Sequence, residues 1–370
     1  MKVAKLYSFN DIRIEDIPVP EIGSGDALMR TRASGICSGD VMPWYIEKKA
    51  PLVLGHEPAG EIINVGRNVE TFQLGGRVAP HHHAPCLECR YCKRGDHVHC
   101  EIWKNTRIIP GGISEYILIP EINLKNDTLI LPENVSYEDG TLIEPLACVL
   151  KGIKRIGFGL KNSNPTYPCP TDGRRVPLNL RGWKEELFSG STVLIIGLGV
   201  MGQLNILVVK RLGACRIIGA DMVQYRLKKA KELGADDVID VSKENLLDSL
   251  KGLTNGYLAD LVIVGPNNAE VMREGISSVG PGGTVLFFTP AKPDERLVID
   301  PNYLYFRDIN IVTSYSCGPA DTKEALMLIE EGVIRAEMLV THRFPIDETD
   351  EAFRLVAEAK ESLKVLISFE

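Results

Sequence analysis

The chain has 370 residues, of which 44% are hydrophobic, so it is long enough for two domains with cores of ordinary size. Lysine and arginine number 42 against 49 aspartate and glutamate residues, and the net charge of -7 gives no general basic field for nucleic acid or an acidic membrane surface. The start of the chain has no signal-type apolar core, so we expect a cytoplasmic protein without membrane spans that acts on small molecules.

The first third of the chain has the pattern of short β segments separated by glycine and proline. Ile12 and Ile14 alternate with charged residues, and further apolar runs cover 27–33, 60–65 and 113–119. This pattern predicts an irregular β-barrel.

Two candidate metal ligands lie among these segments. Cys37 offers a soft thiolate and His56 an imidazole, and a carboxylate from Glu57 or Glu144 would complete an open zinc site with three protein ligands. Asp40 is of the right type to accept a hydrogen bond from His56 and fix its tautomer. We therefore expect a catalytic zinc at this place. The histidine run 81–83 also resembles a metal cluster, but neighbours on a strand point in opposite directions, so we interpret it as a polar strand end.

Four cysteines follow in one polar stretch with spacings of two, two and seven residues: Cys86, Cys89, Cys92 and Cys100. This spacing is typical of a closed tetrahedral zinc site. Interleaved basic residues offset the negative charge of four thiolates. Because a closed site has no open ligand position, we expect this zinc to be structural.

Helical patterning covers 137–156, and Pro145 is expected to kink or break that helix at Glu144. The next segment, 160–190, is rich in turn formers and has no periodicity. A lid, an oligomer contact and a flexible insertion are all compatible with it, and we favour a structural contact.

Strand and helix patterns alternate from residue 192 onward, which predicts a doubly wound parallel sheet. The expected strands are 193–196, 216–220, 237–240, 261–264, 284–288 and 309–313. The tail is expected to contain a helix over 321–331, a strand near Arg343, a second helix through Lys360 and a final strand over 364–368. This tail is expected to return to the barrel.

A glycine-rich turn joins the first of these strands to a helix. Gly197, Gly199 and Gly202 form G-x-G-x-x-G, whose glycines permit a tight turn, close approach of a pyrophosphate and packing of helix on strand. Asp221 ends the second strand, where it can accept hydrogen bonds from ribose hydroxyls and repel a 2′-phosphate, which favours NAD. Further candidate cofactor contacts are Val200, Met201 and Arg226.

Together these motifs resemble the zinc-dependent medium-chain dehydrogenase/reductase (alcohol dehydrogenase) family, with the sorbitol and threonine dehydrogenases as the nearest branch. The resemblance rests on Cys37-Ser38-Gly39-Asp40, Gly55-His56-Glu57, the four-cysteine loop, Ile143-Glu144-Pro145-Leu146, the turn 197–202 and Thr341-His342-Arg343-Phe344. It implies a GroES-like β-barrel catalytic domain over 1–152, a Rossmann NAD-binding domain over 153–313 and a return to the catalytic domain over 314–370. It also implies Cys37, His56, Glu57 and Glu144 at the metal, and a homodimer or homotetramer.

The function that follows is hydride transfer between NAD and a secondary alcohol or ketone, with a polyol, a sugar derivative or a hydroxy amino acid as substrate. One alternative is a primary-alcohol dehydrogenase or aldehyde reductase. Another is a catalytically silent relative that binds nucleotide.

The chain departs from the family in its proton relay. Relatives carry a hydroxyl residue two places after the zinc cysteine and often a histidine five places after it, where this chain has Gly39 and Met42. Neither side chain can exchange a proton. Ser38 is the nearest replacement, and Glu57 or a zinc-bound water is the alternative.

Overall fold

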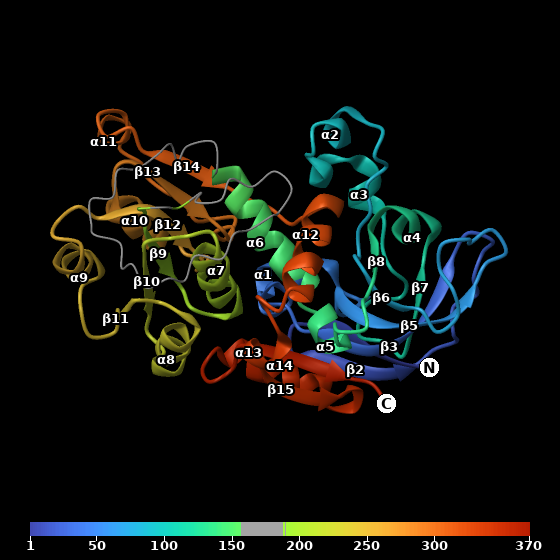
Figure 1. Ribbon diagram of the computed structural model, residues 1–370. Helices are drawn as coiled ribbons and strands as arrows, with labels where there is room; N and C mark the ends of the chain where they lie inside the picture. Colours follow the sequence, from blue (N-terminus) through green and yellow to red (C-terminus); the bar gives the residue numbers. More distant parts are fainter. Residues whose placement is uncertain (157–187, 189) are drawn as a thin grey trace. The chain divides into compact units, whose positions relative to one another are not determined.

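The computed structural model describes residues 1–156, 188 and 190–370, and these form two compact units (Figure 1). The barrel unit contains 1–147 and 316–370, and the parallel-sheet unit contains 148–315. The insertion expected at 160–190 lies outside the described residues except for 188 and 190. Among the described helices, none has both the length and the apolar character needed to cross a bilayer.

The barrel unit is built on a seven-stranded sheet with a small three-stranded sheet beside it. The larger sheet has the order β15 (Val340–Pro345), β16 (Lys364–Ser368), β3 (Ala27–Gly35), β5 (Glu57–Val65), β6 (Arg77–Pro80) and β8 (Thr128–Ile130), with β7 (Tyr116–Ile119) paired to β3. The smaller sheet has the order β2 (Asp11–Asp16), β1 (Lys2–Ser8) and β4 (Leu52–Val53). Apolar side chains of β3, β5, β6 and β7, including Met29, Ile62 and Ile117, form one of its cores.

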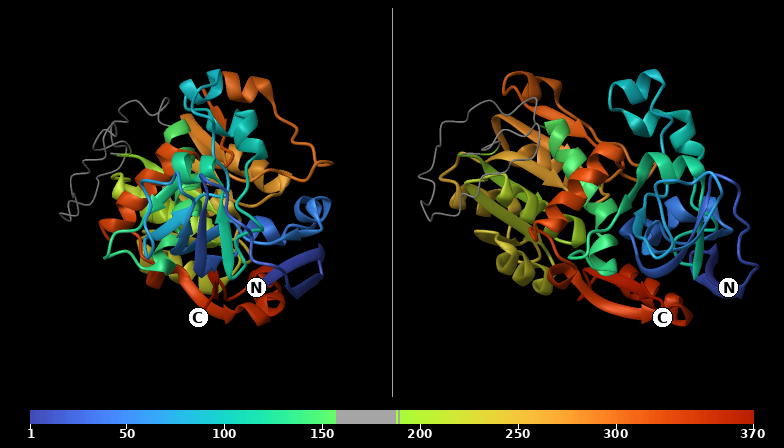
Figure 2. Two further views of the ribbon diagram at one scale, coloured as in Figure 1. Left: turned by 90° about the vertical axis from the view of Figure 1, so that its right-hand side faces the viewer. Right: turned by 45° about the vertical axis from the view of Figure 1, so that its right-hand side comes forward.

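The chain tail returns to the barrel unit and adds two strands to its larger sheet, as the sequence predicts. Strand β16 runs antiparallel to β3, and Leu366 is paired with Gly35. The two chain ends therefore belong to one unit, which both views of Figure 2 show. This return brings a residue from the end of the chain next to the candidate metal ligands.

Short helices surround the barrel sheet. They are α1 (Pro43–Ile46), α2 (Arg90–Lys93), α3 (Glu101–Asn105), α4 (Glu121–Asp127), α5 (Tyr137–Gly140), α12 (Pro319–Glu330), α13 (Ala336–Leu339) and α14 (Thr349–Glu358). Helices α2 and α3 belong to the four-cysteine loop, which stands out from the barrel in Figure 2. The longer helix α6 (Ile143–Ile156) crosses the boundary between the units along the chain.

The expected break at Glu144 is wrong in position. Helix α5 ends at Gly140 and α6 begins at Ile143, so Pro145 is the third residue of a new helix. A proline in the first helical turn costs no intrahelical hydrogen bond, because the N–H groups of that turn have no partner within the helix. The interruption therefore falls before the proline, and Glu144 lies in the first turn of α6.

The parallel-sheet unit has the predicted doubly wound architecture. Its six strands have the order β11 (Asp237–Asp240), β10 (Arg216–Asp221), β9 (Thr192–Ile196), β12 (Ala259–Val264), β13 (Val279–Phe287) and β14 (Asn310–Thr313), and all neighbours are parallel. The helices between and after them are α7 (Val200–Arg211), α8 (Gln224–Leu233), α9 (Leu246–Leu253), α10 (Ala269–Ser278) and α11 (Pro301–Tyr305). Every residue of β9 is buried, as expected for a central strand covered on both faces.

Candidate functional site

The four cysteines of the loop lie close enough together to share one ion. The sulfur atoms of Cys86 and Cys92 are 3.9 Å apart, those of Cys89 and Cys92 3.5 Å, and those of Cys100 and Cys86 3.6 Å. Zinc–sulfur bonds in a tetrahedral site separate the sulfurs by about 3.8 Å. The backbone N–H groups of Glu88 and Cys89 point at the Cys86 sulfur and lower its pKa to about 7, which favours the thiolate. The residues present thus fit a closed zinc site.

Strand pairing in the barrel unit brings Cys37 and His56 together. Gly35 at the end of β3 is paired with Glu57 at the start of β5, so the residues just beyond this pair meet at one end of the two strands. The candidate ligand atoms of Cys37, His56 and Glu57 all lie within 4.8 Å of one another. A thiol, an imidazole and a carboxylate at this spacing form a donor set that fits zinc with one position left open.

A carboxylate behind the histidine holds its ring. Asp40 is 7% exposed, and its Oδ2 lies 3.2 Å from Nδ1 of His56. Burial lowers the pKa of His56, but Asp40 and Cys37 outweigh burial and raise it well above its ordinary value. Burial also raises the pKa of the Cys37 thiol. Metal binding at this place would therefore release protons from both groups.

Lys364, a residue that no sequence motif points to, is the charge partner of Glu57. The two side chains are 1% exposed, and Lys364 Nζ donates a hydrogen bond to Glu57 Oε2. Lys364 also donates to the carbonyl of Ile36, 3.3 Å away and next to Cys37. A Cβ at Gly35 would lie 2.1 Å from Glu57 Oε2, so a glycine leaves room for this ion pair. The sequence offered one signal for this buried charge, which is a lysine at the start of the otherwise apolar strand 364–368.

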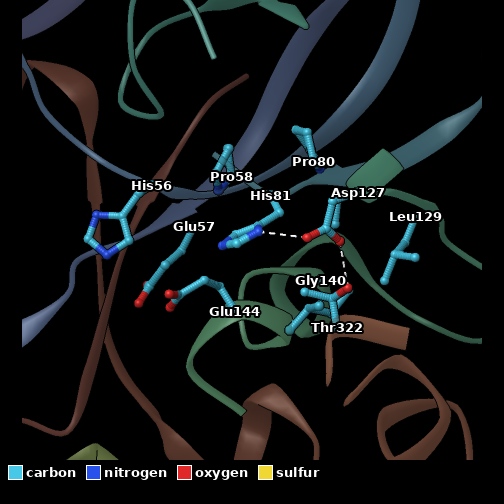
Figure 3. A pocket seen from close by; sticks show the side chains of 12 residues that line it. His56, Glu57, Pro58, Pro80, His81, Asp127, Leu129, Gly140, Glu144 and Thr322 are labelled. Carbon is cyan, nitrogen blue, oxygen red and sulfur yellow. Dashed lines mark hydrogen bonds and ion pairs between the residues drawn. The ribbon is translucent and has the colours of Figure 1, made fainter. Parts of the chain in front are cut away.

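Glu144 lies in a different group from Cys37. Its carboxylate lies within 4.8 Å of the ligand atoms of His81 and Cys317. Glu57, Glu144, His56 and His81 nevertheless line the same small cavity, of about 10 Å³, in the barrel unit (Figure 3). The histidine run was interpreted as a polar strand end, and His81 does follow β6 directly. That interpretation was incomplete, because His81 is only 4% exposed and so is not a solvated residue.

The turn that carries Ser38 begins at the cysteine itself. Cys37 caps a single 3-10 turn, Ser38–Val41, and its sulfur accepts a hydrogen bond of 3.3 Å from the N–H of Gly39. Ser38 is exposed, whereas Asp40 of the same turn is buried. The turn therefore places the side chains of Ser38 and Asp40 in different environments.

The glycine turn of the parallel-sheet unit has the geometry that the motif predicts. Gly197 has φ +86, and a Cβ on it would lie 2.7 Å from the Pro266 ring. A Cβ on Gly202 would lie 2.1 Å from the carbonyl oxygen of Gly197. Gly199 is the N-cap of α7 and has no side chain to cover the first N–H groups of the helix. These N–H groups make a suitable cradle for a phosphate. Val200 and Met201, also expected to contact the cofactor, form the first turn of α7.

Asp221 ends β10 and is held beside this turn. Its Oδ2 accepts a hydrogen bond of 2.7 Å from the N–H of Leu198, and its Oδ1 accepts one of 2.9 Å from Val223. Nη1 of Arg226 lies 3.9 Å from the same carboxylate. Each oxygen of the Asp221 carboxylate keeps a lone pair that could accept from a ribose hydroxyl, and the Arg226 side chain lies next to this carboxylate.

Comparison with known proteins agrees with both units. Residues 23–126 match the model of the alcohol dehydrogenase GroES-like domain, and residues 200–331 match that of the zinc-binding dehydrogenase. The chain is 30% identical to an L-threonine 3-dehydrogenase of Rhizobium etli, covering 92% of this chain and 90% of the relative. It is also 30% identical to a sorbitol dehydrogenase of Bombyx mori, covering 98% and 97%.

A solved structure has the same fold along the whole chain. A zinc-binding dehydrogenase from Sinorhizobium meliloti, bound to NADP, superposes with a TM-score of 0.82 at 25% identity and covers 100% of this chain and 99% of its own. The family models, the relatives and the fold agree with the resemblance found in the sequence. The chain therefore belongs to the zinc-dependent medium-chain dehydrogenase/reductase family.

Proposed function

We propose that the protein is an NAD-linked, zinc-dependent dehydrogenase of secondary alcohols whose substrate is a polyol, a sugar derivative or a hydroxy amino acid. The observation that carries this proposal is the cluster of Cys37, His56 and Glu57 in the barrel unit, of which His56 and Glu57 line a cavity. Relatives named for threonine and sorbitol, both of which carry secondary hydroxyl groups, support this substrate class.

In this proposal Cys37, His56 and Glu57 would hold the catalytic zinc. Asp40 orients His56 through Nδ1 and leaves Nε2 for the metal. When bound, the zinc acts as a Lewis acid that makes a substrate hydroxyl more acidic, or polarises a carbonyl in the reverse direction. Glu57 is chosen over Glu144 because it shares a group with the cysteine and the histidine.

Lys364 sets the charge of this centre. Its ammonium group balances Glu57, so a Cys37 thiolate and a neutral His56 would leave one positive charge on a bound Zn²⁺ uncompensated. In this way Lys364 would help a bound zinc to make the substrate hydroxyl more acidic. A carboxylate without the lysine would weaken this effect.

Ser38 is the group we assign to the substrate proton. It lies on the turn that Cys37 caps, and its exposure allows exchange with water. Glu57 is less suited to this task because Lys364 already holds one of its oxygens. A serine hydroxyl can accept the proton of the substrate while it donates its own.

For the cofactor, the glycine turn and Asp221 support NAD. The Asp221 carboxylate would accept from ribose hydroxyls and repel a 2′-phosphate. Arg226, beside it, would contact the same part of the cofactor. The NADP carried by the Sinorhizobium meliloti structure makes this preference worth testing directly. Homodimeric or homotetrameric assembly and a cytoplasmic location stay predictions.

A substrate panel tests the proposal. Polyols, sugar alcohols, hydroxy amino acids, primary alcohols and the matching ketones and aldehydes are assayed with NAD and with NADP, following the absorbance of the reduced nicotinamide. We expect turnover with a secondary alcohol and NAD. A preference for primary alcohols or aldehydes would favour the first alternative, and no turnover with any substrate would favour a silent nucleotide-binding relative.

A further inference from the structure

A second group of metal-binding side chains lies in the barrel unit beside the candidate catalytic centre. His81 follows β6, Glu144 lies in the first turn of α6, and Cys317 precedes α12. Their ligand atoms all lie within 4.8 Å of one another, and His81 and Cys317 are 4% and 0% exposed. Three residues far apart in the sequence are thus brought together by three different elements.

Hydrogen bonds behind His81 fix the direction of its ring. Its Nδ1 lies 2.7 Å from Oδ2 of Asp127, and the hydroxyl of Thr322 donates to Oδ1 of the same carboxylate at 2.6 Å (Figure 3). An Nδ1–H donated to Asp127 leaves the lone pair of Nε2 free to bind a cation. A carboxylate behind a histidine is the usual support of a metal-binding imidazole.

The spacing between nitrogen and sulfur also fits a metal ion. Nε2 of His81 lies 3.7 Å from Sγ of Cys317. Zinc bonds of ordinary length to a nitrogen and a sulfur in a tetrahedral site separate these two atoms by about 3.6 Å. The carboxylate of Glu144 supplies the third donor, and the cavity of about 10 Å³ that His81 and Glu144 line has room for one water-sized particle.

Cys317, His81 and Asp127 have the side-chain types of a nucleophilic triad, but their surroundings favour a metal. A thiol that is 0% exposed does not meet a substrate, whereas a small ion can reach it. Glu144 has no place in a triad but completes a metal site. Thiolate, imidazole and carboxylate together favour zinc over the hard cations Mg²⁺ and Ca²⁺.

We infer that His81, Glu144 and Cys317 form a further zinc site, distinct from the four-cysteine loop and from the Cys37–His56–Glu57 centre. With a thiolate and a carboxylate, the site would carry no net charge when Zn²⁺ is bound. Two of its residues, His81 and Glu144, line the same cavity as His56 and Glu57 of the candidate catalytic centre. The ion would thus be a neighbour of the substrate-binding metal.

Zinc content measured on full-length variants tests the inference independently of turnover. The background variant is Cys37→Ser, which weakens the candidate catalytic site. After equilibration with zinc and desalting, we expect the Cys37→Ser chain to hold about one zinc more than the Cys37→Ser/Cys317→Ser chain. The matched control is Cys37→Ser/Cys215→Ser, which removes a thiol of similar burial in the parallel-sheet unit and should match the background.

A second variant keeps the test valid if loss of Cys317 disturbs folding. His81→Gln in the same background should lower the zinc content by the same amount, and melting curves show whether each variant is folded. Cobalt in place of zinc gives an independent readout, because Cys317→Ser should weaken the sulfur-to-cobalt charge-transfer band. Equal zinc content with and without Cys317 and His81 would overturn the inference, and the Cys37 centre would be unaffected by that result.

Discussion

The four-cysteine loop and the candidate catalytic centre of the barrel unit are both groups of metal-binding side chains, but they are built in opposite ways. The loop gathers its ligands from Cys86 to Cys100, and two of the four are only partly buried. The candidate catalytic centre gathers Cys37, His56, Glu57 and Lys364 from both ends of the chain and buries the last two almost completely. A loop of four like ligands binds one ion and closes. The candidate catalytic centre instead combines three different donors with a charge partner, and three donors leave one ligand position open, which chemistry requires.

The first way to sharpen this comparison is to remove one ligand from each site. Cys37→Ala should lower kcat/KM by about 10³-fold or more, because zinc supplies several kcal/mol of transition-state stabilisation, while the melting temperature changes little. Cys89→Ala should instead lower the melting temperature, since a closed structural zinc contributes to folding. Melting curves and steady-state kinetics on both variants check this. A Cys37→Ala protein with normal turnover would contradict the roles given to the two sites.

The buried ion pair offers a test that does not depend on a metal. Lys364→Met leaves the carboxylate of Glu57 buried without a partner, so we expect a loss of about 3–5 kcal/mol of unfolding free energy. Denaturant unfolding of the metal-free protein measures it. The matched control is Lys364→Met/Glu57→Gln, which removes the charge as well and should recover much of the stability. Equal stability of the two variants would show that the pair is not coupled.

A substitution of Ser38 separates proton transfer from metal binding at the candidate catalytic centre. Ser38→Ala should lower kcat about 100-fold, the effect typical of a lost general acid or base, without changing the zinc content. Ser38→Thr, which keeps the hydroxyl, serves as the control. Rates are compared over a full pH range under conditions in which chemistry limits turnover. A wild-type kcat in Ser38→Ala would assign the proton to Glu57 or to water.

The smallest change in activity is expected from a substitution in the parallel-sheet unit, at Asp221. Asp221→Ser should shift the ratio of kcat/KM for NAD over NADP by roughly tenfold towards NADP, the equivalent of about one hydrogen bond to a ribose hydroxyl. The substitution also removes the acceptors for Leu198 and Val223, so Asp221→Asn is the control that keeps an acceptor while it removes the charge. Equal use of the two cofactors by the wild-type protein would show that Asp221 does not select NAD.

Local patterns explain what the sequence could predict. The cysteine spacing, the turn at Gly197 and the strand over 364–368 are each set by neighbouring residues, and the structure has them where the sequence placed them. The alternation of strands and helices likewise predicted the six parallel strands. Steric limits on glycine and burial of apolar strands act over a few residues, so they leave a trace in the sequence.

Contacts between distant segments explain what was missed. The pair of Lys364 with Glu57 depends on β16 lying beside β3, and the contact of His81 with Cys317 depends on the return of the chain at residue 316. The position of His81 directly after a strand does not indicate that Cys317, far along the chain, lies next to it. Pro145 was misjudged for a local reason, because the start of α6 at Ile143 decides whether a proline breaks a helix or begins one.

Stepwise removal of zinc tests the central claim most directly. A mild chelator is titrated into the wild-type protein, and zinc content, turnover and melting temperature are measured on the same samples. We predict that turnover disappears while the loop zinc is still bound and the melting temperature is unchanged, and that added zinc restores the activity. Full turnover in a protein that retains only the zinc of the four-cysteine loop would contradict the assignment of catalysis to the cavity.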